Sequence, residues 1–158
     1  AVSLSKSFVT FVEDEPLIGD VNDAAKKIHQ KLKEIESSTK PTAIVWGGET
    51  TVKIKGSGLG GRNQELALIV AELAHQDPIR KSWTFLSGGT DGRDGPTEAA
   101  GAIVDQETCK RILNEGYQVY DFLAENNSNK ALKISNDLLH TGATGTNVAD
   151  VQILIVSQ

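Results

Sequence analysis

The chain has 158 residues, 39% of them hydrophobic, a formal net charge of -5 and a single cysteine. This length suits one domain with a sizeable core, and the acidic balance argues against nucleic acid or anionic lipid as the main partner. One cysteine cannot form an internal disulfide or a cysteine-rich metal site, and no apolar run is long enough to span a membrane. We therefore expect a cytoplasmic protein with neither a membrane nor a nucleic-acid partner.

The beginning of the chain is expected to lead into the domain. The first residues are apolar and extended in character but have no obvious partner in the sequence. From Asp20 to Ile35 apolar residues recur at helical spacing, and Asp20 or Asn22 can cap the start, which predicts a helix. Because the chain also begins without methionine, we expect a piece of a longer protein, with residues 1–40 as the lead-in and residues 41–158 as the domain.

Two strand-like segments and a helix follow. Ala43–Trp46 is typical of a buried strand that ends at Gly47–Gly48, while Thr51–Lys55 alternates apolar and polar residues like an edge strand. We expect the glycine turn to fold the second segment back antiparallel to the first. Asn63–His75 is apolar over a wide arc of a helix, and Trp83–Leu86 is typical of another buried strand.

The second half of the chain alternates in the same way. We expect a short strand over Ala102–Val104 and helices over Thr108–Asn114, Val119–Glu125 and Lys130–Leu139. Val151–Val156 is nearly continuous in apolar residues, which is typical of a central strand covered on both faces. The alternation predicts an α/β fold, a single layered domain with a mixed β-sheet flanked by helices.

Gly56, Gly58 and Gly61 have the spacing of the dinucleotide-binding fingerprint G-x-G-x-x-G. The context does not fit a dinucleotide site, because the preceding segment Thr51–Lys55 carries two outward lysines instead of being apolar on both faces. The acidic residue that would bind the ribose is expected about 20 residues later, where the chain is still near the end of a helix. The glycines are better explained as a flexible loop that leads to Arg62.

Arg62 follows these glycines at the start of the predicted helix. Backbone N–H groups and the helix dipole favour an anion there, and the planar guanidinium suits a carboxylate or a phosphate. Alternatively, Arg62 pairs with Glu65 or Glu49 as a surface brace. The local sequence leaves both interpretations open.

Two further loops carry residues that suit a site. Ser87–Thr97 follows a buried strand and contains Asp91, Arg93 and Asp94, and paired acids of this kind could hold Mg²⁺ or fix an arginine. Thr141–Asp150 precedes the last strand and is rich in hydroxyl groups and turn formers. Each loop alone is ordinary turn chemistry, but several in one compact domain indicate a shared site.

The glycine-rich motifs occur together and in a fixed order: GGET at 47–50, GGRNQE at 60–65, GTDG at 89–92 with DGP at 94–96, AAG at 99–101 and TGTN at 144–147. Across about residues 43–156 the chain resembles the MOFRL domain, the C-terminal domain of the glycerate 2-kinase family, which has historically also been labelled hydroxypyruvate reductase. It departs from the family pattern at Ala143, where proline is common. The larger, Rossmann-like N-terminal domain of the family is absent from this sequence.

The resemblance implies an ATP- and Mg²⁺-dependent kinase that phosphorylates D-glycerate in a cleft between two domains. It places the catalytic lysine and most nucleotide contacts in the N-terminal domain, which is the expected partner of this chain. This fragment alone is therefore expected to be inactive. An NAD(P)-dependent hydroxypyruvate reductase and a non-catalytic interaction module that retains the fold are the alternatives.

The resemblance makes Arg62 the catalytic residue of this part of the enzyme. Asp91 is the one candidate metal ligand, and no cofactor-binding residue is assigned. We expect Glu49, Arg62, Asp91 and Asn147 to cluster at one edge of the sheet, with Gly56–Gly61 mobile in the absence of the partner domain. The residues expected to bind substrate or to support the site are Glu49, Asn63, Asp91, Asp94, Thr144, Thr146 and Asn147.

Overall fold

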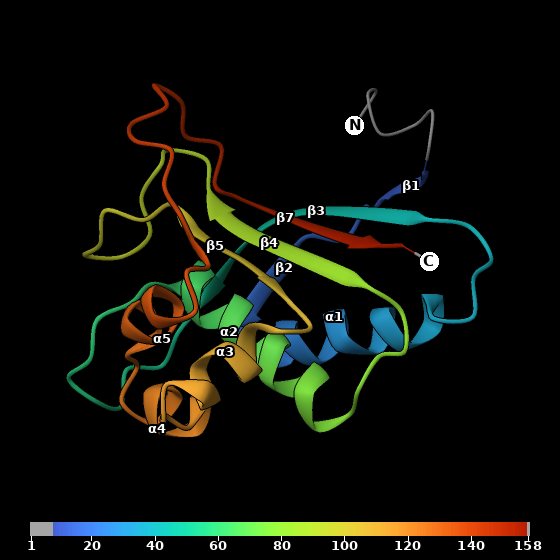
Figure 1. Ribbon diagram of the computed structural model, residues 1–158. Coiled ribbons are helices and arrows are strands. Elements are labelled where there is room, and N and C mark those ends of the chain that lie inside the picture. The colour runs from blue at the N-terminus through green and yellow to red at the C-terminus, as the bar shows by residue number, and fades with distance from the viewer. Residues whose placement is uncertain (1–7, 158) are drawn as a thin grey trace.

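The computed structural model describes residues 8–157, which form one mixed sheet of seven strands and five helices. Figure 1 shows the sheet nearly edge-on, with the helices of the described residues in one layer below it. The predicted α/β domain with a single mixed, helix-flanked sheet is confirmed. The helices cover one face of this sheet.

The helices cover only one face of the central strand β7 (Asp150–Val156). Its residues alternate between buried and half-buried positions, and Leu154 and Val156 belong to the main core. The expectation of a strand covered on both faces is therefore wrong for the described residues, because a strand in antiparallel pairing tolerates one open face. β7 runs antiparallel to both neighbours, β3 (Thr42–Thr51) and β4 (Trp83–Gly89).

The early part of the chain joins the same sheet. β1 (Val9–Val12) and β2 (Leu17–Asp20) both run parallel to β3 and pair with its first and last residues. α1 (Val21–Ile35) begins where the Asp20 side chain accepts a hydrogen bond from the backbone N–H of Asn22 at 2.8 Å, an N-cap that the sequence indicated. The predicted apolar face of this helix is buried, with Val21, Ala24, Ile28 and Leu32 in the core.

β3 is one continuous strand of ten residues, so the expected turn at Gly47–Gly48 is wrong. Both glycines continue the strand and pair with the start of β7. A Cβ at Gly48 would lie 2.1 Å from the carbonyl oxygen of Leu17 in β2, so glycine here permits the close approach of a neighbouring strand. Residues 52–55 consequently form a loop instead of a returning strand.

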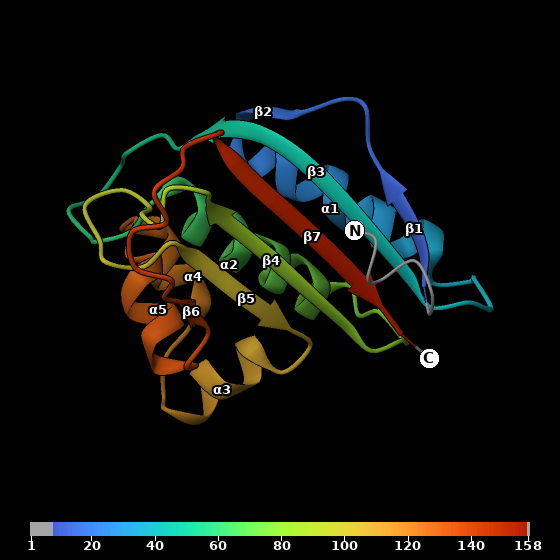
Figure 2. The ribbon, with the colours of Figure 1, turned by 90° about the horizontal axis from the view of Figure 1, so that it is seen from above.

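The strands lie in the order β1-β3-β7-β4-β5-β6, with β2 also on β3. β5 (Gly101–Asp105) and β6 (Leu138–Leu139) form the far side of the sheet. α2 (Arg62–Gln76) is the central helix and packs on α1, β4 and β5. Figure 2, seen from above, shows α1 beneath β3 and α2 beneath β4.

Three short helices complete the layer: α3 (Thr108–Asn114), α4 (Val119–Ala124) and α5 (Ser128–Ile134). The first two match their predicted positions closely. The third begins and ends earlier than expected, because Asn136 has a left-handed φ of 61° and the following residues pair with β5 as β6. The largest fully buried side chains of the core include Phe85, Ile28, Leu32, Ile44, Leu66, Leu68, Ile112, Leu132 and Leu154.

Candidate active site

Three strand ends and one helix start meet at one edge of the sheet. β3 and β4 end there and β7 begins there, so that Gly48, Asp150 and Gly89 are neighbours in the register. The loop after β4 and the loop before β7 extend beyond this edge, and α2 begins below it (Figures 1 and 2). The edge therefore brings together the segments that carry the predicted site residues.

Arg62 is the first residue of α2, and two carboxylates hold its guanidinium group. Nε donates to Oδ2 of Asp150 at 2.7 Å and Nη2 donates to Oδ1 at 3.0 Å, which makes a bidentate pair. Nη1 lies 3.1 Å from Oε1 of Glu49. The side chain of Asp150 is fully buried, whereas those of Arg62 and Glu49 are 36% and 60% exposed. The hydrogen bonds to Asp150 raise the pKa of Arg62, so the guanidinium is a permanent cation.

Asp150 is the partner that the sequence reasoning missed. The sequence placed it only as the last residue of a polar loop, and an acid directly before an apolar strand was the available signal. Of the two acids considered as partners of Arg62, Glu49 does form an ion pair with it. Glu65 instead is buried and accepts a hydrogen bond from Nδ2 of Asn126 at 3.1 Å.

Asp94 occupies the N-terminus of α2. Its Oδ1 accepts hydrogen bonds from the backbone N and the Nδ2 of Asn63 at 3.0 and 3.3 Å. Its Oδ2 accepts from the backbone N and the Nε2 of Gln64, both at 2.9 Å. Burial raises the pKa of Asp94, and these four donors oppose the rise. The backbone N–H groups at the N-terminus of α2 are therefore already bonded to Asp94. An anionic ligand at this edge can bind the guanidinium of Arg62 but not the N-terminus of the helix.

The side chains of Asn63 and Gln64 continue this network into the interior. Oδ1 of Asn63 accepts from the hydroxyl of Ser87 at 2.6 Å, and Nε2 of Gln64 donates to the hydroxyl of Thr97 at 2.9 Å. Nδ2 of Asn129 donates to Oε1 of Gln64 at 2.8 Å. The network ties the first turn of α2 to β4, to the loop after β4 and to α5. Asn63 is fully buried in it, so its amide is closed to solvent.

Thr90 joins the loop after β4 to the loop before β7. Its backbone N and its hydroxyl both donate to the carbonyl of Ala149, at 3.0 and 2.7 Å. The carbonyl of Thr90 accepts from the hydroxyl of Thr144. Ala149 has a φ of 67°, a left-handed conformation that is strained for a residue with a side chain. The contacts of Thr90 thus hold the turn that delivers Asp150 to Arg62.

The other predicted loop residues lie at the edge without contacting the guanidinium. Asp91 and Asn147 turn back on their own loops, where their side-chain oxygens accept backbone hydrogen bonds at 3.0 and 3.2 Å. The backbone N of Thr146 donates to the hydroxyl of Thr144 at 3.4 Å. Within residues 8–157, no hydrogen bond or ion pair joins these four residues to Arg62. Their roles as substrate ligands stay predictions.

Of the glycines with the dinucleotide-like spacing, Gly56 and Gly58 pack against the turn between α4 and α5, and Gly61 packs against Asp94. The backbone N of Gly58 donates to the carbonyl of Glu125 at 2.8 Å. A Cβ at Gly56 would lie 2.4 Å from Cα of Glu125, and a Cβ at Gly58 would lie 2.5 Å from Cβ of Asn127. Glycine at these positions therefore lets the loop backbone approach neighbouring segments of the protein closely. These contacts do not fit the expected mobile loop.

The part of the chain that the structure describes has no group of three or more His, Cys, Asp or Glu side chains suited to a metal ion. Asp91 could supply one carboxylate oxygen, whereas Mg²⁺ requires near-octahedral oxygen coordination. The edge alone therefore does not fit a resident magnesium ion. Among the same residues, no helix is long and apolar enough to cross a membrane.

A model of the MOFRL family matches residues 42–150 of this chain. The chain belongs to the MOFRL family. The matched range ends at Asp150 and includes Glu49, Arg62, Asp91 and Asp94. The residues that meet at the edge of the sheet thus lie within the matched range, and the predicted resemblance is confirmed.

Relatives of this MOFRL chain are named as glycerate kinases. It is 41% identical to the D-glycerate 2-kinase of Thermotoga maritima over 161 residues, and this alignment covers 99% of the chain and 38% of that protein. It is 45% identical to the glycerate kinase of Homo sapiens over 134 residues, which covers 82% of the chain and 26% of that protein. The chain therefore spans well under half the length of these relatives.

Solved structures agree with the fold. The crystal structure of the Thermotoga maritima glycerate kinase matches with a TM-score of 0.91 at 41% identity, covering 99% of this chain and 38% of that one. A crystal structure of a protein from Pyrococcus horikoshii matches with a TM-score of 0.88 at 39% identity, covering 100% and 37%. The MOFRL domain thus has the same architecture in a chain that carries substantially more sequence.

Proposed function

We propose that this chain is the C-terminal part of an ATP-dependent kinase that transfers the γ-phosphoryl group of ATP to D-glycerate, in a cleft shared with the N-terminal domain of the same protein. The names of its relatives support the substrate and the reaction. The observation that carries the chemistry is the Arg62–Asp150 pair, because it presents a fixed cation at an accessible edge. A cytoplasmic location is part of the proposal, in line with a single free cysteine.

The guanidinium of Arg62 has donors left for a ligand. Of its five N–H groups, one on Nε and one on Nη2 donate to Asp150, and Nη1 forms an ion pair with Oε1 of Glu49 at 3.1 Å. The edge formed by Nη1 and Nη2 is the part of the guanidinium that Asp150 leaves open, with Glu49 beside Nη1, and the side chain is partly exposed. Two neighbouring N–H groups fit two oxygens of a carboxylate or of a phosphoryl group.

The charge of this cluster supports a role for a second domain. One guanidinium faces two carboxylates, so the cluster has a surplus of one negative charge. D-Glycerate and ATP are both anions, so their binding here requires further cations. We propose that the N-terminal domain holds most of ATP and Mg²⁺ and that this chain contributes Arg62. Asp91 is proposed only as a single additional ligand or as support for the loop.

Phosphoryl transfer depends mainly on positioning and on neutralising charge at the transferring group. Arg62, oriented by the buried carboxylate of Asp150, would bind the glycerate carboxylate or the phosphoryl oxygens without a change in the orientation of its guanidinium. Asp94 keeps the first turn of α2 in place beneath it. We propose that Thr144, Thr146 and Asn147 offer hydroxyl and amide groups to the substrate from the loop before β7.

The activity of the full-length protein tests the proposal. With D-glycerate, ATP and Mg²⁺ we expect ADP formation that depends on glycerate. With hydroxypyruvate and NADH we expect no oxidation of NADH, because the glycine loop is packed against the α4–α5 turn. Oxidation of NADH without ADP formation would support the reductase, and activity in neither assay would support a non-catalytic module.

A further inference from the structure

We propose, on the basis of the kinase function above, that the carboxylate of Glu49 occupies part of the Arg62 guanidinium that the substrate anion binds. Glu49 is then an internal competitor that sets the affinity of the site for D-glycerate. The proposal assigns the two carboxylates on Arg62 different roles, with Asp150 orienting the guanidinium and Glu49 exchanging with the ligand.

The contacts of the two carboxylates differ in the way this division requires. Asp150 binds Nε and Nη2 together at 2.7 and 3.0 Å, and its side chain has no exposed surface. Glu49 approaches Nη1 alone, at 3.1 Å, and its side chain is 60% exposed. A ligand from solvent can therefore reach the nitrogen that Glu49 contacts, whereas Asp150 is covered.

The exchange of Glu49 for a ligand has a small energetic cost. An exposed ion pair with a single contact contributes little to stability, because water and salt screen it. A carboxylate of the substrate is chemically equivalent to the carboxylate that it replaces. The backbone at Glu49 is fixed by pairing with Ile18 of β2, so a rotation of the side chain alone frees Nη1.

The net charge beside Arg62 also becomes more favourable for an anion when Glu49 moves away. With Glu49 paired, Arg62 is surrounded by more negative than positive charge. When Glu49 leaves Nη1, that N–H group and its neighbour on Nη2 form an open edge for two oxygens. Glutamine at position 49 would remove the competing charge and keep the size of the side chain.

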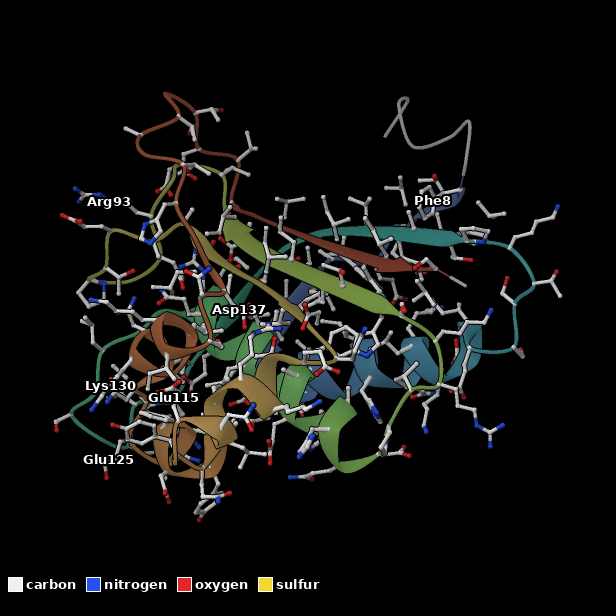
Figure 3. The ribbon with its side chains drawn as sticks, viewed as in Figure 1. Phe8, Arg93, Glu115, Glu125, Lys130 and Asp137 are labelled. Carbon is white, nitrogen blue, oxygen red and sulfur yellow. The ribbon has the colours of Figure 1, made fainter. Side chains whose placement is uncertain are left out.

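The test is Glu49→Gln in the full-length protein, with the KM for D-glycerate and the dissociation constant for D-glycerate without ATP as readouts. We expect both to fall by about two- to five-fold, the range that corresponds to an exposed ion pair. Glu115→Gln is the matched control, because it removes the same charge from an exposed glutamate among the helices, away from the sheet edge (Figure 3). The control is expected to leave both constants unchanged.

An unchanged or higher KM and dissociation constant in Glu49→Gln would overturn the proposal, since Glu49 would then be neutral or needed for binding. An equal fall in Glu115→Gln would also overturn it, because the effect would come from overall charge. If the wild-type protein binds D-glycerate without phosphorylating it, the proposed function fails while the dissociation constants still test Glu49. Absence of binding by both proteins would overturn both proposals.

Discussion

Arg62 and Asp150 are 88 positions apart in the sequence and form a bidentate ion pair between the start of α2 and the start of β7. The carboxylate is fully buried and the guanidinium is partly exposed. A buried charge of this kind depends on its partner, because an unpaired charge in the interior is strongly unfavourable. The pair therefore couples the orientation of Arg62 to the central strand of the sheet.

Asp150→Asn should lower kcat of the full-length protein by about 10- to 100-fold, with a smaller change in KM. The amide retains the shape but places an N–H group against the guanidinium, so the guanidinium turns. Steady-state kinetics with D-glycerate measure both constants. Asp137→Asn is the control. Asp137 also binds an arginine, with its Oδ1 at 2.6 Å from Nη2 of Arg111, but this pair lies away from the predicted site. Similar losses of kcat in both variants would contradict a positioning role for Asp150.

Local patterns in the sequence predicted most of the elements. α1, α2 and α3 begin and end within about two residues of the predicted positions, because their apolar faces are local signals and α1 also has a local cap at Asp20. The pattern at Gly47 and Gly48 predicts a turn, whereas both glycines lie within β3. Glycine that permits close strand approach has the same local pattern as glycine in a turn, and only the position of Leu17 distinguishes them.

The candidate site was predictable in part. The ion pair of Glu49 with Arg62 was considered from the sequence, and the edge of the sheet brings these two residues together. Asp150 and Asp94 contact the start of α2 from 88 and 31 positions away. No periodicity indicates such contacts. For the same reason the start of α2 appeared open to a ligand anion, although Asp94 occupies it.

Glu65→Gln should change how stability depends on pH. Burial raises the pKa of Glu65 above its ordinary value of 4.5, so the folded state keeps a proton that the unfolded state has already lost. The raised pKa of Glu65 therefore stabilises the folded protein at low pH. This stabilisation is complete below the ordinary pKa and is lost as the pH rises through the folded-state pKa. Glutamine removes the titration and keeps an acceptor for Asn126.

The stability of Glu65→Gln relative to the wild type should therefore be higher at about pH 7 than at about pH 4. Urea unfolding at the two pH values measures the difference in the free energy of unfolding. The same difference at both values would contradict the raised pKa.

Cys109 should not react while the protein is folded. Its side chain is buried in the core, and its Sγ lies 3.7 Å from Oε2 of Glu72. Burial raises the pKa of the thiol strongly, so the reactive thiolate is absent at neutral pH. A thiol-specific reagent such as DTNB should modify Cys109 in guanidinium chloride and not in native buffer. Rapid modification of the native protein would contradict this burial.

The 158-residue chain alone should have no kinase activity. Its described residues form no metal-binding cluster, and its glycine loop is packed against the α4–α5 turn. ADP formation with D-glycerate, ATP and Mg²⁺ is the measurement, and the full-length protein at the same concentration is the positive control. Glycerate-dependent turnover by a preparation free of other kinases would contradict this prediction.

Arg62 and Arg111 have similar surroundings and different predicted roles. Their side chains are 36% and 34% exposed, and each guanidinium is held by two carboxylates, which for Arg111 are those of Asp105 and Asp137. Arg111 also donates from Nε to the carbonyl of Ser135 at 3.0 Å, which ties α3 to the end of α5. We infer that Arg111 braces the helices, whereas Arg62 serves the reaction.

Arg62→Lys and Arg111→Lys in the full-length protein separate these roles, because lysine keeps the charge and loses the planar pair of donors. Arg62→Lys should lower kcat/KM for D-glycerate about 100-fold or more, with little change in melting temperature. Arg111→Lys should lower the melting temperature and leave kcat/KM of the folded protein unchanged. Near-normal turnover by Arg62→Lys together with a large fall in its melting temperature would contradict the catalytic role of Arg62 and make it a structural brace.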